Sequence, residues 1–187
     1  MSNIPSIREK CTGALLASAI GDSLGWPYEF RARNVQNNLS MGDGHFIDWN
    51  RKSGGRYWSH SETILAGEYS DDTQMILAVS RSIISGYGWK EYFSFKELPY
   101  WLRYERGGGT ALKRAAKIYR DHHLPWMSSS AKDYYNAGGN GAAMRILPHV
   151  IAHANSKDVE QLLDDVFANS IITHGHPRAI LGATCYA

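Results

Sequence analysis

The sequence has only two cysteines, no run of like charges and no long apolar stretch, and each absence excludes a class of protein. Cys11 and Cys185 are solitary and far apart, which excludes a disulfide framework and a CxxC metal site and favours a reducing cytoplasm. The 20 basic and 18 acidic residues are interspersed, which argues against a nucleic-acid or anionic-membrane surface. The apolar stretch GALLASAIG is far shorter than the ~20 residues that span a bilayer. We therefore expect a cytoplasmic protein that contacts neither membrane nor nucleic acid.

Alternating β-branched runs are also absent, whereas helical signals recur along the chain. Ser6 to Glu9 is a capping box, and Pro177 is suited to the first position of a last helix. A helix is also expected after Asp72, another around 96–104 with an interruption at Pro99, and another with Thr110 as its cap. The clearest apolar stripe, at helical spacing, consists of Val159, Leu162, Leu163, Val166, Phe167 and Ile171. These patterns predict an all-α fold, an irregular multi-helix bundle with glycine-rich loops.

With 187 residues, 43% of them hydrophobic, the chain can bury one substantial core, so we expect a single domain over 1–187. A long irregular stretch from Gly25 to Gly67 is rich in glycine, asparagine, serine and tryptophan. Loops of this length are uncommon in compact domains and tend to be functional. We therefore expect this stretch to be functional.

Two adjacent carboxylates, Asp71 and Asp72, lie at a predicted helix start between the hydroxyls of Ser70 and Thr73. The amino end of a helix favours negative charge, which accounts for one acid but does not require two. Adjacent carboxylates repel each other, so keeping both suggests a nearby cation. Oxygen ligands suit Mg²⁺, Mn²⁺ or Ca²⁺. Spacing alone leaves both a doubly acidic cap and a metal site open.

Two further acids lie upstream, at the end of the first predicted helix and in the aromatic stretch after it. Asp22 would face the negative end of the helix dipole, so we expect it to hold a loop by accepting hydrogen bonds from backbone N–H groups. Glu29 lies among Trp26, Tyr28 and Phe30. It could be a surface residue or a partly desolvated acid/base group.

Other signals have ordinary explanations beside functional ones. The loop 139–144, GNGAAM, resembles part of a dinucleotide fingerprint, but no strand precedes it. It could bind phosphate at a helix start or simply form a turn. His149 and His153 have helical spacing without the glutamate of a zinc protease, which favours a core or solvated pair. His174 could cap a helix end, and Arg145 could pair with a surface acid.

Four segments, in order, resemble the ADP-ribosylglycohydrolase family over nearly the whole chain. They are GALLASAIGDSLGWPYEF, then YSDDTQM with Ser70 where the family usually has threonine, then the glycine loops RGGG and GGNGAAMRILP, and last ITHGHPRAI. The resemblance implies an all-α domain that holds two Mg²⁺ or Mn²⁺ ions. It also implies cleavage of the N- or O-glycosidic bond that joins ADP-ribose to a modified substrate.

The resemblance also implies roles for residues that match the family's motifs. The implied metal ligands are Ser70, Asp71, Asp72 and Glu29. The implied catalytic residues are Glu29, Asp71 and Asp72. The residues implied to contact ADP-ribose are Gly108, Gly109, Gly138, Gly139, Asn140 and His174.

The sequence departs from the family in one respect, because the late Asp-x-Asp-Thr block that supplies the other metal ligands is absent from these 187 residues. We therefore expect an incomplete domain that a second chain or a second copy completes. On its own the chain should bind metal weakly and leave apolar helix faces uncovered. The alternatives are a non-catalytic ADP-ribose-binding or regulatory module, and a purely structural protein.

Overall fold

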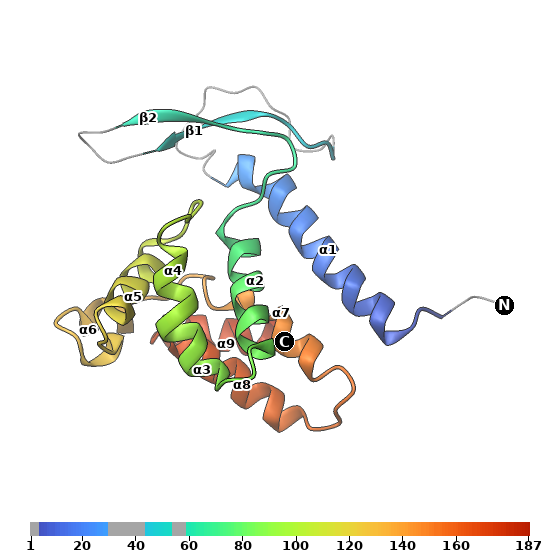
Figure 1. The fold of residues 1–187 in the computed structure, drawn as a ribbon, viewed down its shortest axis with the longest axis vertical. Helices are drawn as coiled ribbons and strands as arrows, with labels where there is room; N and C mark the ends of the chain where they lie inside the picture. The colour runs from blue at the N-terminus through green and yellow to red at the C-terminus, as the bar shows by residue number, and fades with distance from the viewer. Residues whose placement is uncertain (1–3, 30–43, 54–58) are drawn as a thin grey trace.

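Helices dominate the computed structural model, which describes residues 4–29, 44–53 and 59–187 (Figure 1). The prediction of an all-α bundle is confirmed, apart from one small hairpin. The helical elements are α1 (Ile7–Gly25), η1 (Trp26–Tyr28), α2 (Asp71–Ile84), α3 (Trp89–Tyr92), the π-helix η3 (Phe93–Glu97), α4 (Leu98–Trp101), α5 (Thr110–Arg120), η4 (Pro125–Met127), α6 (Ala131–Tyr135), η5 (Ala143–Arg145), α7 (Leu147–Ala152), α8 (Val159–Ile171) and α9 (Pro177–Tyr186).

The hairpin consists of β1 (Trp49–Ser53) and β2 (His60–Ile64), paired antiparallel with Trp49 opposite Ile64. It corrects the prediction that the stretch 25–67 is irregular throughout. Residues 30–43 and 54–58 of that stretch lie outside the described residues. Ile64 is fully buried, while the other four residues of β2 are exposed or partly exposed. A hairpin with this little buried apolar surface carries no alternating signal in its sequence.

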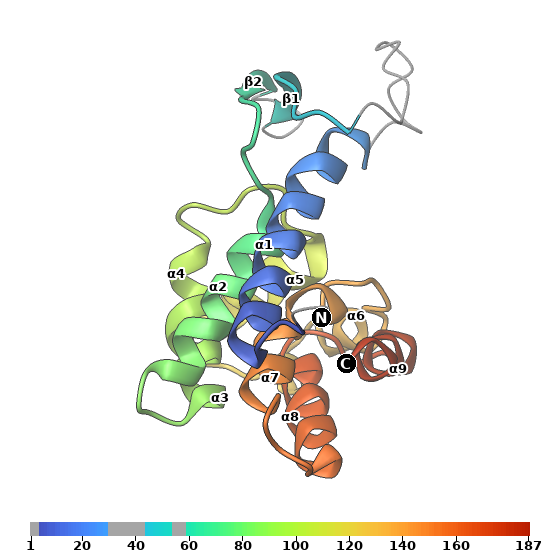
Figure 2. The same ribbon diagram turned by 90° about the vertical axis from the view of Figure 1, so that its right-hand side faces the viewer.

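Helix α1 begins at the predicted capping box and lies mostly at the surface. Ser6 N–H donates to Glu9 Oε2 at 2.8 Å and Glu9 N–H to Ser6 Oγ at 3.3 Å, which confirms the capping box. Ser23 is the buried residue of this helix. α1 contacts α2, and its amino-terminal half extends away from the other helices in Figure 1 and towards the viewer in Figure 2. In the described part of the chain, no helix combines the length and apolarity needed to cross a membrane.

Helix α2 lies at the centre of the molecule, where it contacts α1, α3, η3, η5 and α7. Its inner face joins the main core, which includes Met75, Val79, Phe93, Leu98, Trp101, Leu112 and Tyr119. A second cluster includes Ala142, Ile146, Val166 and Ala183. Val166 is therefore the buried member of the stripe predicted along α8, since Val159 and Phe167 are 62% and 49% exposed.

Two helix boundaries differ from the sequence predictions. The helical run around 96–104 starts earlier, at Trp89, and passes Pro99 without interruption before it ends at Trp101. Pro99 lies in the first turn of α4, where the missing N–H is tolerated, and the π-helical turns of η3 precede it. Thr110 is the first residue of α5 and not its cap, because Gly109 occupies the cap position without a side-chain bond. The prediction that Pro177 begins the last helix is confirmed.

Candidate active site

The two predicted carboxylates, Asp71 and Asp72, occupy the first turn of α2. Ser70 is the N-cap, and its Oγ accepts a hydrogen bond from Asp72 N–H at 3.2 Å. Ser70 and Asp71 are buried, while Asp72 is partly exposed. The helix therefore begins with both acids side by side and only one of them open to solvent.

Asp22 of α1 holds this helix start in place. Its carboxylate accepts from Ser70 N–H at 3.1 Å and from Thr73 N–H at 3.0 Å. The hydroxyls of Ser70 and Thr73 also donate to it, each at 2.6 Å. The prediction that Asp22 accepts from backbone N–H groups is confirmed, and the structure identifies the loop as the start of α2. The two hydroxyls that flank the carboxylate pair are thus partners of Asp22.

The acids at this end of α2 shift one another's ionisation. Burial raises the pKa of Asp71 to about 7, and repulsion from Asp72, Glu29 and Asp22 adds to the rise. The pKa of Asp72 is raised to about 6, mainly by burial and to a smaller extent by repulsion from Asp22 and Glu29. Partial desolvation, and then Asp22, raises the pKa of Glu29. Crowded carboxylates with raised pKa values are typical of functional sites.

A cavity of about 960 Å³ adjoins the carboxylates and gathers residues from distant parts of the chain. Its lining includes Asp22, Trp26, Glu29, Ser70, Asp72 and Met144. Tyr186, at the end of α9, lines it as well. The cavity therefore joins the end of α1, the start of α2 and the segment after the second glycine loop. This arrangement suits a site for a sizeable polar ligand.

The donors at this site fit a hard cation in kind but not in number. Asp71, Asp72 and Glu29 offer carboxylate oxygens, and Ser70 Oγ retains one lone pair beyond its bond to Asp72 N–H. However, nowhere in residues 4–29, 44–53 and 59–187 do three or more His, Cys, Asp or Glu side chains gather closely enough to hold a metal. The described residues can therefore supply part of a coordination shell.

The first glycine loop lies beside the carboxylates. A Cβ on Gly107, whose φ is 91°, would lie 3.4 Å from Asp71 Oδ1. A Cβ on Gly108 would overlap the Trp101 ring, so this predicted ligand contact has a packing role. Gly109 is exposed, with no described atom within 4 Å of its Cβ position. Gly108 is therefore needed for close packing, whereas Gly109 is accessible.

The second glycine loop packs against the segment that contains His174. His174 is buried after the end of α8, with its ring 2.8 Å from where a Cβ on Gly141 would lie. Burial lowers the pKa of His174 to about 3, so the ring is neutral, and it forms a 2.7 Å hydrogen bond with Thr173 Oγ1. Gly138 O accepts from Arg178 Nε at 3.1 Å. Gly139 and Asn140 are exposed.

Arg145 anchors the end of that loop from the interior, which corrects the prediction of a surface ion pair. It is fully buried and donates to Gly141 O, Asn169 Oδ1 and Asn169 O, each at 2.7 Å. Asn169 also lies 3.1 Å from Nε2 of the buried His149. His153 pairs with Asp165 at 2.9 Å, so the two histidines belong to packing contacts.

The family model described as ADP-ribosylglycohydrolase matches residues 3–187. The chain belongs to the ADP-ribosylglycohydrolase family. It is 30% identical, over 92% of its length, to the ADP-ribosyl-[dinitrogen reductase] glycohydrolase of Rhodospirillum rubrum, and covers 54% of that protein. It is 27% identical, over 95% of its length, to the ADP-ribosylarginine hydrolase Tri1 of Serratia proteamaculans, and covers 44% of it.

A solved structure, an ADP-ribosylglycohydrolase-related protein complex, has the same fold. It matches with a TM-score of 0.65 at 24% identity and covers 95% of this chain and 53% of that one. The chain thus spans about half the length of the curated relatives it matches. The part of the solved structure that this chain matches is likewise about half of that structure's chain.

Two residues of this ADP-ribosylglycohydrolase chain lie at the carboxylates without having been predicted there. Gly107 borders Asp71, and Trp26 lines the cavity beside Asp72. The only sequence signal for Gly107 was that RGGG has one glycine more than the two implied contacts. Trp26 gave no signal, since its position depends on contacts with remote segments.

Proposed function

We propose that this chain forms part of the active site of a hydrolase that cleaves the N- or O-glycosidic bond between ADP-ribose and a modified substrate. One observation carries the proposal. Asp22 holds the start of α2 through Ser70 and Thr73, and Asp72 at that start lines a cavity that Asp22 and Glu29 also line. The names of the two relatives, a glycohydrolase and an ADP-ribosylarginine hydrolase, support the same reaction class.

The proposal includes Mg²⁺ or Mn²⁺, with two ions in the complete site. Ser70, Asp71, Asp72 and Glu29 would hold them, and the remaining ligands would come from a second chain or a second copy of this one. Bound divalent cations would supply Lewis-acid activation of a water and hold the ribose hydroxyls. The repulsion that Asp71 and Asp72 experience from each other and from Glu29 supports this, because a cation would relieve it.

Hydrolysis requires one proton to be taken and one to be given. The water oxygen bonds to the anomeric carbon while the bond from that carbon to the leaving nitrogen or oxygen breaks. A carboxylate takes the proton that the water loses, and an acid gives one to the leaving group. Glu29 suits the proton transfers because it is exposed at the cavity, and because partial desolvation and then Asp22 raise its pKa. The exposed Gly109, Gly139 and Asn140 would contact ADP-ribose directly. Gly108, Gly138 and His174, the other residues implied to contact it, would shape the two loops through their packing.

A second function is favoured by one observation. The described residues gather no group of three metal-ligating side chains, which suits a non-catalytic ADP-ribose-binding or regulatory module. The two functions differ in one requirement: the hydrolase needs another polypeptide to complete its active site, whereas the ADP-ribose-binding module does not. In either case we place the protein in the cytoplasm, as Cys11 and Cys185 are free thiols.

Calorimetric titration of the 187-residue chain with ADP-ribose, with and without Mg²⁺, tests the proposal. We expect Mg²⁺ to tighten binding, and the combined Asp71→Asn and Asp72→Asn changes to abolish that effect. Asp164→Asn, an exposed acid in α8, is the matched control and should bind like the parent chain. Binding that ignores Mg²⁺ and survives the double change would refute the metal site.

The reaction itself needs the polypeptide that completes the domain. With it present, we expect release of ADP-ribose from an ADP-ribosylated arginine peptide, and Glu29→Gln should slow turnover by roughly 10²–10⁴-fold while ADP-ribose still binds. No release from N- or O-linked substrates, despite Mg²⁺-dependent binding, would favour the binding module.

A further inference from the structure

Among the described residues, Trp26 Nε1 is the buried side-chain nitrogen or oxygen atom without a hydrogen-bond partner. The Trp26 side chain is only 3% exposed. Leaving a buried donor unpaired costs about 1–3 kcal/mol, so such atoms are rare and call for an explanation. This one lies at the proposed active site.

Trp26 is tied to the carboxylates from two directions. Its backbone N–H donates to Asp22 O at the end of α1, and Asp22 in turn holds the start of α2. On the other side, a Cβ on Gly107 would lie 3.2 Å from Trp26 Nε1 and 3.4 Å from Asp71 Oδ1. Arg51 Nη1 lies 3.5 Å from the same Cβ position. The indole N–H, the Asp71 carboxylate and the Arg51 guanidinium therefore converge on one small space, which only glycine leaves open.

Neighbouring side chains fix the indole ring in this position. Trp49 packs edge-on against it, with ring centroids 5.3 Å apart and planes at 84°. The guanidinium carbons of Arg51 and Arg106 lie 5.5 and 5.3 Å from the ring centroid. Ion pairs in turn hold both arginines, Arg51 to Glu62 and Arg106 to Glu68. Two cations beside the ring make its N–H a stronger donor, because they draw electron density from the indole.

We infer that Trp26 is a positioning residue of the proposed metal site, whose indole N–H hydrogen-bonds to Asp71 when a divalent cation holds that carboxylate. The inference rests on the proposed function. A tryptophan N–H can only donate, so it suits an ionised carboxylate and cannot compete with Asp71 for the cation. Carboxylates that ligate metals are themselves oriented by hydrogen bonds from outer partners, whose loss weakens metal binding. Trp26 Nε1 is the unpaired buried donor that borders, with Asp71, the space beside Gly107.

Indole N–H spectroscopy of the ¹⁵N-tryptophan-labelled full chain tests this directly. Its six tryptophans give six indole signals, and Trp26→Phe identifies the relevant one by its disappearance. On titration with Mg²⁺, the Trp26 proton should move downfield and saturate together with the calorimetric binding curve. Trp26→Phe should bind Mg²⁺ or Mn²⁺ about 10–100-fold more weakly, since it keeps the ring and loses the donor. Trp126→Phe, a ring of η4 outside the cavity lining, should leave the affinity unchanged.

The possible outcomes separate this inference from the function on which it rests. If Mg²⁺ binds with dependence on Asp71 and Asp72 while the Trp26 signal stays still and Trp26→Phe binds equally well, the positioning role is wrong and the metal site stands. If the parent chain binds neither Mg²⁺ nor Mn²⁺, the metal site in this chain and the positioning role are both overturned, and release of ADP-ribose by the completed domain decides the proposed reaction. Should Trp26→Phe fail to fold, assignment of the parent's indole signals by triple-resonance methods leaves the Mg²⁺-dependent shift to decide.

Discussion

At the scale of single residues, the contacts of Asp22 limit which roles Asp71 and Asp72 can have. The start of α2 needs acceptors for its first N–H groups. Ser70 Oγ accepts from Asp72 N–H, and Asp22 accepts from Thr73 N–H and Ser70 N–H. These contacts already pair the N–H groups of Asp72 and Thr73, and the Asp71 carboxylate accepts from its own N–H, so capping does not require both Asp71 and Asp72. Their retention together, with mutual repulsion and partial burial, is explained better by a ligand than by the helix.

Replacing Asp22 by asparagine should destabilise the fold. The amide keeps one acceptor oxygen but turns an NH₂ group towards donors of Ser70 or Thr73, so at least two of the bonds are lost. We expect the free energy of unfolding to fall by about 2 kcal/mol in urea denaturation. Asp164→Asn, on an exposed surface of α8, should change it by less than about 0.5 kcal/mol. Equal effects of the two changes would contradict the anchoring role of Asp22.

Buried His149 should make the protein sensitive to acid. Burial lowers its pKa to about 4, with smaller effects from charged neighbours, namely Asp165, which acts in the opposite direction, and His153, Arg145 and Lys90. The unfolded chain binds a proton near pH 6.5 and the folded chain only near pH 4, so stability falls as pH drops through that window.

Comparing the parent chain with His149→Gln isolates the pH-dependent part of the unfolding free energy that His149 contributes. Glutamine can still accept a hydrogen bond from Asn169, but it does not titrate. Between pH 7.5 and 4.5 the parent should lose about 2 kcal/mol more unfolding free energy than the variant. Urea denaturation at both pH values measures it. Parallel losses in the two proteins would show that His149 is not kept neutral by the fold.

At the scale of elements, signals confined to a few neighbouring residues predicted the structure well. The capping box of α1, the start of α2 and the proline that opens α9 all depend on contacts within one turn. The hairpin was missed because most residues of β2 are exposed and give no apolar pattern. The burial of the apolar stripe of α8 was overestimated, because Val159 and Phe167 follow the pattern but are exposed. Burial depends on remote partners, which a periodic pattern does not identify.

The same division applies to the site. Asp71, Asp72 and Glu29 could be singled out as candidates because acids are conspicuous at a helix start and in an aromatic stretch, and their roles, with that of Ser70, stay predictions implied by the family resemblance. The environment of Trp26 and the burial of Arg145 could not, because each results from packing between distant segments. Arginine is rarely buried, so a surface position was the reasonable expectation.

Two adjacent glycines of the first loop should respond differently to alanine. At Gly108 a Cβ would collide with the buried Trp101 ring, so Gly108→Ala should lower the free energy of unfolding by about 1–3 kcal/mol. At Gly109, with φ −64° and open space, the same change should be nearly neutral. Urea denaturation of both variants checks this. If ADP-ribose affinity falls only for Gly109→Ala, the accessible glycine contacts ligand and the buried one serves packing.

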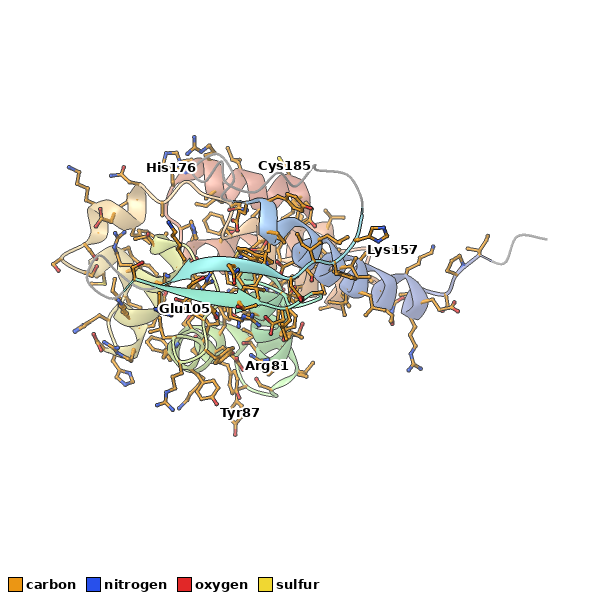
Figure 3. All side chains as sticks on the ribbon, turned by 90° about the horizontal axis from the view of Figure 1, so that it is seen from above. Arg81, Tyr87, Glu105, Lys157, His176 and Cys185 are labelled. Carbon is orange, nitrogen blue, oxygen red and sulfur yellow. The ribbon has the colours of Figure 1, made fainter. Side chains whose placement is uncertain are left out.

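At the scale of the whole molecule, apolar side chains are exposed on several elements around the described core. On α1, Leu16 and Ile20 are 59% and 49% exposed, and on α9 Leu181 and Tyr186 are 61% and 64% exposed. Viewed from above, Cys185 and His176 of α9 lie on one side of the hairpin, while Arg81 and Tyr87 lie on the other (Figure 3). Since Tyr186 and α1 both border the cavity, a polypeptide covering these surfaces would also reach the carboxylates.

Hydrogen exchange should therefore distinguish α1 from α2 in the chain alone. α1 buries only Ser23 in the described structure, whereas α2 buries eight residues, so α1 should open without global unfolding. We expect α1 amides in dilute protein to exchange at least about tenfold faster than those of α2, measured by mass spectrometry.

A polypeptide that completes the domain should slow exchange in α1 and leave α2 unchanged. Leu16→Glu should prevent this protection without destabilising the isolated chain, because Leu16 is already exposed. Equal, strong protection of α1 and α2 in dilute protein would mean that α1 needs no further partner.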